Sequence, residues 1–115
     1  MTNIRNDEPP RVFVTKTEPH WDFYRAADYG DVVFMTEHEY KSEPAPPAHN
    51  RMVRQEIEDC LVKHQYRPGT DFILLTAAQS NNMVVMFAIR HLMGDHKFLR
   101  WNSNSERYDI YRVSQ

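Results

Sequence analysis

Hydrophobic positions in the first third of the chain form two short β-type runs around a helical segment. The runs RVFVTKT (11–17) and DVVFMT (31–36) are rich in β-branched residues, and the second resembles a strand buried on both faces. Between them, residues 20–29 can form a short helix that ends at Gly30, a residue suited to a left-handed C-terminal position. This region therefore predicts a strand, a short helix and a second strand.

The middle of the chain predicts a proline-rich loop and then a long helix. Residues 37–49 carry three prolines among charged and small residues, which excludes the interior of a helix or strand. From Asn50, a suitable N-cap, apolar residues recur at helical spacing until Pro68-Gly69 ends the pattern. The loop fits a lid or a docking strip for a partner, and it also fits a solvated connector.

The last third of the chain predicts a strand–helix–strand unit and a returning strand. The expected elements are a strand at 72–76, an apolar helix at 82–93 stopped by Gly94, a strand at 97–101, a turn at 102–105 and a strand at 107–113. The complete order favours an α/β fold of three layers, with a mostly parallel sheet of four to five strands, helices on both faces and a C-terminal β-hairpin at one edge. We expect residues 1–10 to form a flexible lead-in and residues 11–115 a single domain.

Composition narrows the class of protein. The chain has 115 residues, 41% of them hydrophobic and 26% charged, which argues against disorder and against a membrane protein. A net charge of −2 argues against generic nucleic-acid binding, because no basic field gathers phosphates. The N-terminus has no secretory pattern, and the single cysteine, Cys60, falls on an apolar helix face. We therefore expect a cytoplasmic protein with Cys60 in its core.

The polar loop between the third strand and its helix is the best candidate ligand site. Ligands of open α/β sheets gather at the carboxyl ends of strands, where helix N-termini present N–H groups. The loop lacks the glycines and the lysine of known phosphate-binding motifs, so a nucleotide or another anion remains a hypothesis, and its polar residues also suit helix capping. The candidate ligand residues are Thr76, Gln79, Ser80, Asn81 and Asn82, with Lys16 and Arg100 supplying positive charge from neighbouring strand ends.

The helix that follows this loop is apolar on nearly every side. Such a helix either packs centrally or leaves one surface for a partner, and methionine-rich surfaces adapt well to partners. The candidate interface residues are Met83, Met86 and Phe87 of the helix, with Pro44, Pro46 and Pro47 of the loop. We therefore expect the protein to bind a partner through these residues, either another protein or a second copy of itself.

Other chemistry is less well supported. No spacing of histidines, cysteine or carboxylates predicts a metal site or a cofactor, and no nucleophile motif suggests a catalytic residue. Aromatic and basic residues interleave in the last third of the chain, as Trp101 and Tyr108 beside Arg100 and Arg112 illustrate. On a hairpin they could stack single-stranded nucleic acid, although ordinary cross-strand pairing also explains them.

Three segments of the chain resemble small uncharacterised proteins of tailed phages. They are DYGDVVFMT, then DFILLTAAQ with the apolar helix after it, and then FLRWNSNSERYDIY. Where that pattern has a glycine-serine pair after the third strand, this chain has Ala77-Ala78-Gln79. The resemblance implies a phage origin, and it supplies no catalytic residue. Our leading hypothesis is a phage accessory protein that binds another protein or itself, and the alternatives are a nucleotide- or anion-binding protein or small enzyme, or a binder of single-stranded nucleic acid.

Overall fold

The computed structural model describes residues 9–18 and 23–114. Its elements are the strands β1 (Arg11–Val14), β2 (Asp31–Phe34), β3 (Phe72–Leu75), β4 (Asp95–Asn102) and β5 (Arg107–Ser114), the helices α1 (Pro47–Lys63) and α2 (Gln79–Ile89), and the 3-10 helix η1 (Tyr24–Asp28). They form one five-stranded sheet in the order β2-β1-β3-β4-β5. The first four strands are parallel and β5 is antiparallel to β4, so the sheet is mixed. The expected α/β class and C-terminal hairpin are confirmed.

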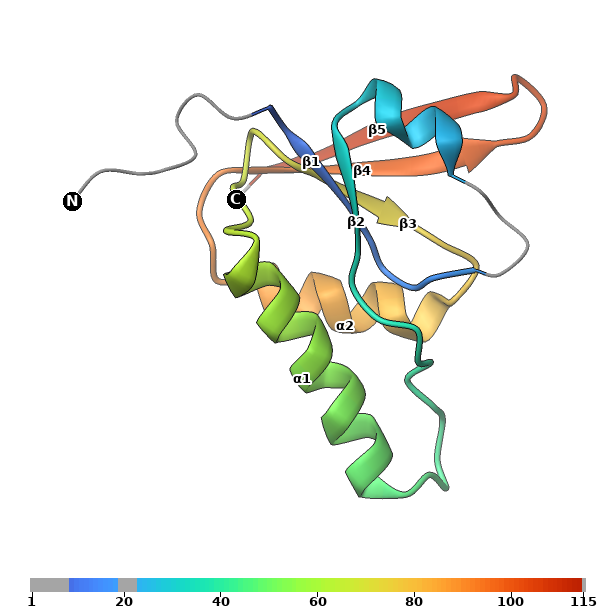
Figure 1. Ribbon diagram of the computed structural model, residues 1–115, viewed down its shortest axis with the longest axis vertical. Helices are drawn as coiled ribbons and strands as arrows, with labels where there is room; N and C mark the ends of the chain where they lie inside the picture. The colour runs from blue at the N-terminus through green and yellow to red at the C-terminus, as the bar shows by residue number, and fades with distance from the viewer. Residues whose placement is uncertain (1–8, 19–22, 115) are drawn as a thin grey trace.

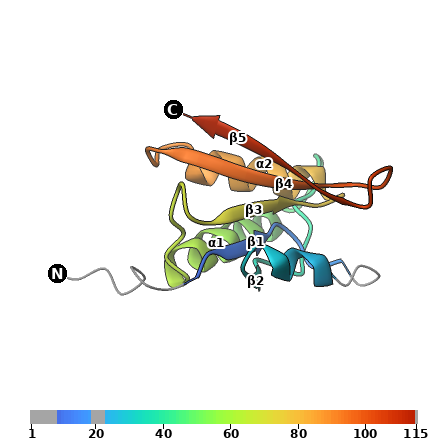
Figure 2. The same ribbon diagram turned by 90° about the horizontal axis from the view of Figure 1, so that it is seen from above.

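The direction of each crossover explains how the helices are arranged. From β1 the chain moves one way across the sheet to β2, whereas β2 to β3 and β3 to β4 both move the opposite way. Because parallel crossovers are right-handed, opposite directions put their connections on opposite faces. Accordingly, α1 and α2 cover one face and η1 lies on the other (Figure 1), and the strands lie side by side in the stated order (Figure 2).

The core has two parts because side chains alternate along each strand. On the helix side, Phe13 and Ile73 of the sheet are fully buried with Val53 and Ile57 of α1. Cys60 is buried in the same cluster, as expected. On the η1 side, Val12, Leu74, Leu99 and Tyr108 pack with Phe23 and Ala26.

The predicted start of the long helix is wrong by four residues. Helix α1 begins at Pro47, because the ring of proline presets the backbone angle of a first helical residue. Asn50 is therefore not the N-cap. Its side-chain amide instead exchanges two hydrogen bonds of 2.9 Å with the backbone of Lys41, which ties the proline loop to the helix.

The predicted boundaries of the other two helices also shift. Residues 20–22 of the expected short helix lie outside the described residues, and the described part forms only the 3-10 turn η1. Helix α2 begins at Gln79 and ends at Ile89, three and four residues before the predicted limits.

Helix α2 is not packed centrally. Val85 and Ile89 are buried against the sheet, whereas Met83 is 68%, Met86 40% and Phe87 50% exposed. Within the described residues, no helix is long and apolar enough to cross a bilayer.

Candidate functional site

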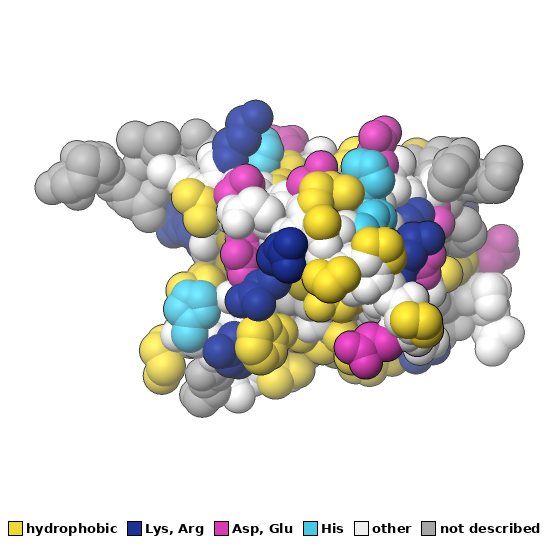
Figure 3. Space-filling view, turned by 90° about the horizontal axis from the view of Figure 1, so that it is seen from below, with side chains coloured by type: hydrophobic (Ala, Val, Ile, Leu, Met, Phe, Trp, Pro, Cys, Tyr) yellow, Lys and Arg dark blue, Asp and Glu magenta, His cyan; other side chains and the backbone are white. Residues whose placement is uncertain are grey.

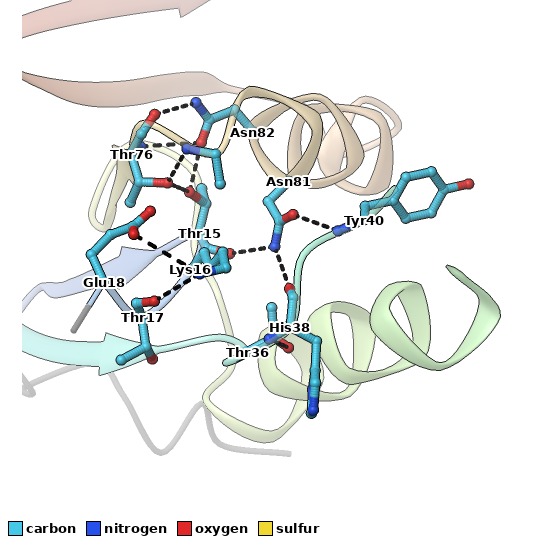
Figure 4. A network of polar contacts seen from close by, with 11 residues as sticks. Thr15, Lys16, Thr17, Glu18, Thr36, His38, Tyr40, Thr76, Asn81 and Asn82 are labelled. Carbon is cyan, nitrogen blue, oxygen red and sulfur yellow. Dashed lines mark hydrogen bonds and ion pairs between the residues drawn. The ribbon is translucent and has the colours of Figure 1, made fainter. Parts of the chain in front are cut away.

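Two threonines meet where the connections from the parallel strands diverge. The chain leaves β1 and β3 in opposite directions across the sheet, and ligands of open α/β sheets bind at such switch points. Thr15 follows β1 and Thr76 follows β3, and their side-chain oxygens lie 3.0 Å apart (Figure 4). The site therefore begins with two hydroxyl groups held together across adjacent strands.

Asn82, in the first turn of α2, locks this threonine pair. Its Oδ1 accepts hydrogen bonds from the hydroxyl of Thr15 at 2.6 Å and from the backbone N–H of Thr76 at 3.2 Å. Its Nδ2 donates to the carbonyl of Thr76 at 2.9 Å. Since Asn82 is buried, these contacts fix the start of α2 against the ends of both strands.

Asn81 points the other way and holds the segment after β2. Its Nδ2 donates to the carbonyls of Thr15 and His38, and its Oδ1 accepts the N–H of Tyr40 at 2.8 Å (Figure 4). The hydroxyl of Ser80 donates to the carbonyl of Tyr40. These polar groups are occupied by contacts within the chain, and neither residue lines the pocket described next.

A pocket of about 670 Å³ opens beside the carboxyl end of β3, and we call it the β3 pocket. Strand β4 and its partner β5 continue beyond the end of β3 and supply one wall. The residues that line it are Glu18, Phe23, Leu74, Leu75, Thr76, Ala77, Gln79, Asn82, Arg100, Trp101 and Tyr108. Its volume is in the range of small-ligand sites, which run from about 300 to 1,000 Å³.

The charged groups of the β3 pocket differ in how far they are neutralised. Arg100 is exposed, and its guanidinium makes no hydrogen bond or ion pair with any described residue. Asp109 is its direct neighbour in the β4–β5 ladder, but the carboxylate of Asp109 accepts the Asn102 amide at 3.1 Å. Glu18 is offset by Lys16, whose ammonium lies 3.9 Å from its carboxylate. The N–H donors of Arg100 are therefore free to bind a ligand, with the carboxylate of Asp109 as a neighbouring negative charge.

Aromatic side chains form the apolar wall of the pocket. The rings of Trp101 and Tyr108 meet edge to face with centroids 5.1 Å apart, and the Arg25 guanidinium lies 5.7 Å from the Trp101 ring. Tyr108 is only 6% exposed, so this pair is not an open platform for single-stranded nucleic acid. Tyr111 is exposed, but it alternates onto the opposite face of the hairpin.

A second polar cluster lies away from the pocket and holds the segment after β2 to α1. Oε1 of Glu56 accepts a 2.6 Å hydrogen bond from the hydroxyl of Thr36, and the Nδ1 of His38 lies 3.0 Å from the same atom. The Thr36 hydrogen bond and the nearby His38 ring lower the pKa of Glu56. Among the described residues, no group of three His, Cys, Asp or Glu side chains is placed to hold a metal ion.

The structure divides the candidate ligand residues into two groups. Thr76, Gln79, Asn82 and Arg100 line the β3 pocket together, whereas Ser80, Asn81 and Lys16 lie outside its lining. Sequence analysis did not assign Glu18, Phe23, Trp101 or Tyr108 to this site. The sequence marked Trp101 and Tyr108 only as aromatic residues interleaved with arginines in the hairpin, and no pattern in the sequence marked Phe23 or Glu18.

Comparisons with known proteins connect this chain to a family of phage proteins. No curated protein and no solved structure matches the chain. A family model described as "Phage Pam3 gp32-like protein" matches residues 7–115 and confirms the resemblance to small phage proteins. Because this match covers nearly the whole chain, the protein belongs to the Phage Pam3 gp32-like family.

Proposed function

We propose that this phage accessory protein acts by binding, and that it binds a small anionic ligand in the β3 pocket. The observation that carries the proposal is Arg100, a residue of the pocket lining whose guanidinium has no partner among the described residues. A guanidinium offers five N–H donors in a rigid fork, so it suits a carboxylate or a phosphate. The amide of Gln79 and the hydroxyl of Thr76 add neutral polar groups on the β3 side.

The Thr15–Thr76–Asn82 network supports the proposal indirectly. It fixes the loop between β3 and α2 with one buried hydrogen bond of 2.6 Å and two partly buried ones of 2.9 and 3.0 Å, so the pocket wall is held in place before a ligand arrives. A preformed site loses less conformational freedom when it binds, and this favours affinity.

Thermal unfolding in the presence of phosphate, pyrophosphate, small carboxylates and nucleotides tests the proposal. A ligand at one hundred times its Kd stabilises the fold by about 2.7 kcal/mol, which raises Tm by roughly 10 °C in a domain of this size. Arg100→Gln should remove the shift. Arg112→Gln, which removes an exposed arginine of the same hairpin outside the pocket, should retain it. No shift with any anion would refute the proposal.

A second candidate function is protein binding through α2, either to another protein or to a second copy of the chain. Its support is the exposed surface formed by Met83, Met86 and Phe87, which we call the α2 patch. Arg54 and Arg90 lie 5.5 and 3.7 Å from the Phe87 ring, so the patch is bordered by positive charge. Figure 3 shows the helix side of the molecule, where hydrophobic side chains lie among lysines and arginines. The other candidate contacts are three exposed prolines, Pro44 and Pro46 in the loop before α1 and Pro47 at its first residue.

Light scattering and affinity capture test this second candidate. Phe87→Asp should abolish a dimer or a captured host protein, because it places a charge in the middle of the apolar contact. Val62→Asp is the matched control, since Val62 is 77% exposed on α1 and is not part of the patch. A monomer that retains no partner would exclude the function. Under either candidate we infer that the protein works in the host cytoplasm, where the unoxidised thiol of Cys60 fits a reducing environment.

A further inference from the structure

Strand β5 forms one margin of the sheet, and among the described residues its outer side is open. It pairs with β4 over all eight of its residues, and no described strand lies beyond it (Figure 2). In an edge strand, alternate backbone N–H and C=O groups point away from the sheet, where they can pair with another strand. β5 therefore offers an edge for strand addition that is twice as long as the opposite edge, the four-residue β2.

The side chains of β5 do not block this edge. Proteins commonly protect an exposed edge with lysine, proline, a bulge or a covering segment. The strand contains neither lysine nor proline, and its ladder with β4 runs without a bulge. Ile110 is 50% exposed on the η1 side of the sheet, and Tyr111 and Val113 are 47% and 55% exposed on the helix side. Both faces of β5 therefore carry apolar side chains that a neighbouring strand would cover.

The ladder with β4 identifies the charges that a neighbouring strand must suit. Arg112 lies directly opposite Lys97, and burial and the charge of Arg112 lower the pKa of Lys97. Asp109 lies directly opposite Arg100, so its charge is offset within the hairpin. A further cation beside Arg112 is therefore less favourable than a further carboxylate beside Asp109.

We propose that β5 pairs antiparallel with β5 of a second copy of the chain, about a two-fold axis at Ile110. Such an axis is perpendicular to the sheet, so residues of the same face lie opposite each other and one residue lies opposite its own copy. An axis at Asp109 or at Arg112 would place like charges directly opposite each other. An axis at Tyr111 would make the two Arg112 side chains diagonal neighbours, each already beside a lysine.

The axis at Ile110 avoids these repulsions. It places Ile110 against its own copy, and the carboxylates that become diagonal neighbours are those of Asp109, which Arg100 offsets. It also brings the turn residue Glu106 of one copy beside the end of β5 that carries Arg112 of the other. The two five-stranded sheets then form one sheet of ten strands. The inference goes beyond both candidate functions, since it needs neither a ligand in the β3 pocket nor the α2 patch.

Disulfide cross-linking at single introduced cysteines tests the register. Residues directly opposite each other in antiparallel strands have Cα atoms about 4.5 to 5.5 Å apart, which a disulfide can span, whereas diagonal neighbours are about 7 to 8 Å apart. Ile110→Cys should therefore form a covalent dimer under mild oxidation, and Tyr111→Cys should not. The unaltered protein is the control, because its single cysteine, Cys60, is buried. Cross-linking of Tyr111→Cys in place of Ile110→Cys would overturn the register.

Light scattering of the full-length chain over a range of concentrations tests the dimer itself. One strand pair makes a small interface, below about 1,200 Å², so the mean mass should rise with concentration. Ile110→Lys should weaken the dimer at least tenfold, because it places two ammonium groups opposite each other at the axis, whereas Ile110→Val should retain it. Val62→Lys adds the same charge at an exposed residue of α1 and is the matched control.

The outcomes separate β5 pairing from a contact through the α2 patch. If Phe87→Asp dissociates the dimer and Ile110→Lys does not, the copies meet through the α2 patch and the inference is overturned. An unaltered protein that stays monomeric at every concentration would overturn it as well, and ligand binding in the β3 pocket would be unaffected. Circular dichroism shows whether each variant folds, and the mass of the unaltered protein tests the dimer even where a variant does not.

Discussion

Replacing Asn81 with alanine tests whether the amide network, rather than hydrophobic packing alone, holds the loops around the pocket. The side chain is fully buried and makes three hydrogen bonds, to the carbonyls of Thr15 and His38 and to the N–H of Tyr40. A hydrogen bond contributes about 1 kcal/mol net, and buried groups left without a partner cost more. We therefore expect Asn81→Ala to lower the free energy of unfolding by about 3 to 4 kcal/mol, a large part of the about 5 to 15 kcal/mol typical of a domain.

Urea denaturation followed by tryptophan fluorescence measures this loss. The matched control is Asn50→Ala, because Asn50 makes two hydrogen bonds to the backbone of Lys41 at an exposed site. Water can replace those bonds, so the control should lose about 0.5 kcal/mol or less. Equal losses in the two variants, or a loss below about 1 kcal/mol for Asn81→Ala, would refute the argument that buried polar pairing governs this region.

The Asn81→Asp variant adds a test by pH. It keeps an acceptor for the N–H of Tyr40 but turns a second oxygen toward the carbonyls of Thr15 and His38. Burial and these carbonyls should raise the pKa of the introduced carboxyl in the folded state above its unfolded value of about 3.9. The variant should therefore lose stability as pH rises above about 4, by up to about 1.4 kcal/mol per pH unit until the folded-state pKa is passed. A flat stability profile between pH 4 and 7 would contradict the contacts assigned to Nδ2.

Three further predictions concern other buried or linked groups. Burial raises the pKa of the Cys60 thiol to about 11, so labelling by a disulfide reagent at pH 8 should be slow, and it should speed up in urea. Tyr66→Phe removes a buried 2.7 Å hydrogen bond to Nδ1 of His96 and should lower the free energy of unfolding by about 1 to 2 kcal/mol in urea denaturation. Thr36→Val removes the hydrogen bond that contributes most to lowering the pKa of Glu56, so carbon NMR titration of that carboxyl should show a higher pKa. If the pKa of Glu56 is the same in Thr36→Val as in the unaltered protein, the lowering of that pKa is due to His38 instead.

Much of the fold can be predicted from the sequence because strands and helices leave local patterns. The runs around Val12, Val33 and Ile73 predicted parallel strands, and the polar turn before residues 107–113 predicted the returning strand of the hairpin. Helix ends were predicted less well. The observed ends of α1 and α2 differ from the predicted ones by three or four residues, because of the backbone preference of Pro47 and the packing of α2. Such differences depend on contacts with distant residues, which a local sequence pattern does not include.

The candidate site was predicted only in part. Thr76, Gln79 and Asn82 lie in one loop, so their proximity follows from the chain itself. Arg100 was placed near them because its strand was expected to be a neighbour of β3. In contrast, Phe23 and Glu18 reach the pocket from the connection between β1 and β2, and nothing local to those residues indicates it.

The amino-acid sequence by itself determined the elements of this protein, its α/β class, the loop at the end of β3 and the apolar character of α2. These properties depend on the periodicity and chemistry of neighbouring residues. The tertiary structure alone decided that α2 leaves Met83 and Phe87 exposed, and that Asn81 binds the backbone of the loop at Tyr40. It also decided that Arg100 lines a pocket while its guanidinium has no partner among the described residues. The physical reason is that burial and hydrogen-bond pairing are set by residues far apart in the chain, which meet only when the crossovers assign each helix to a face of the sheet.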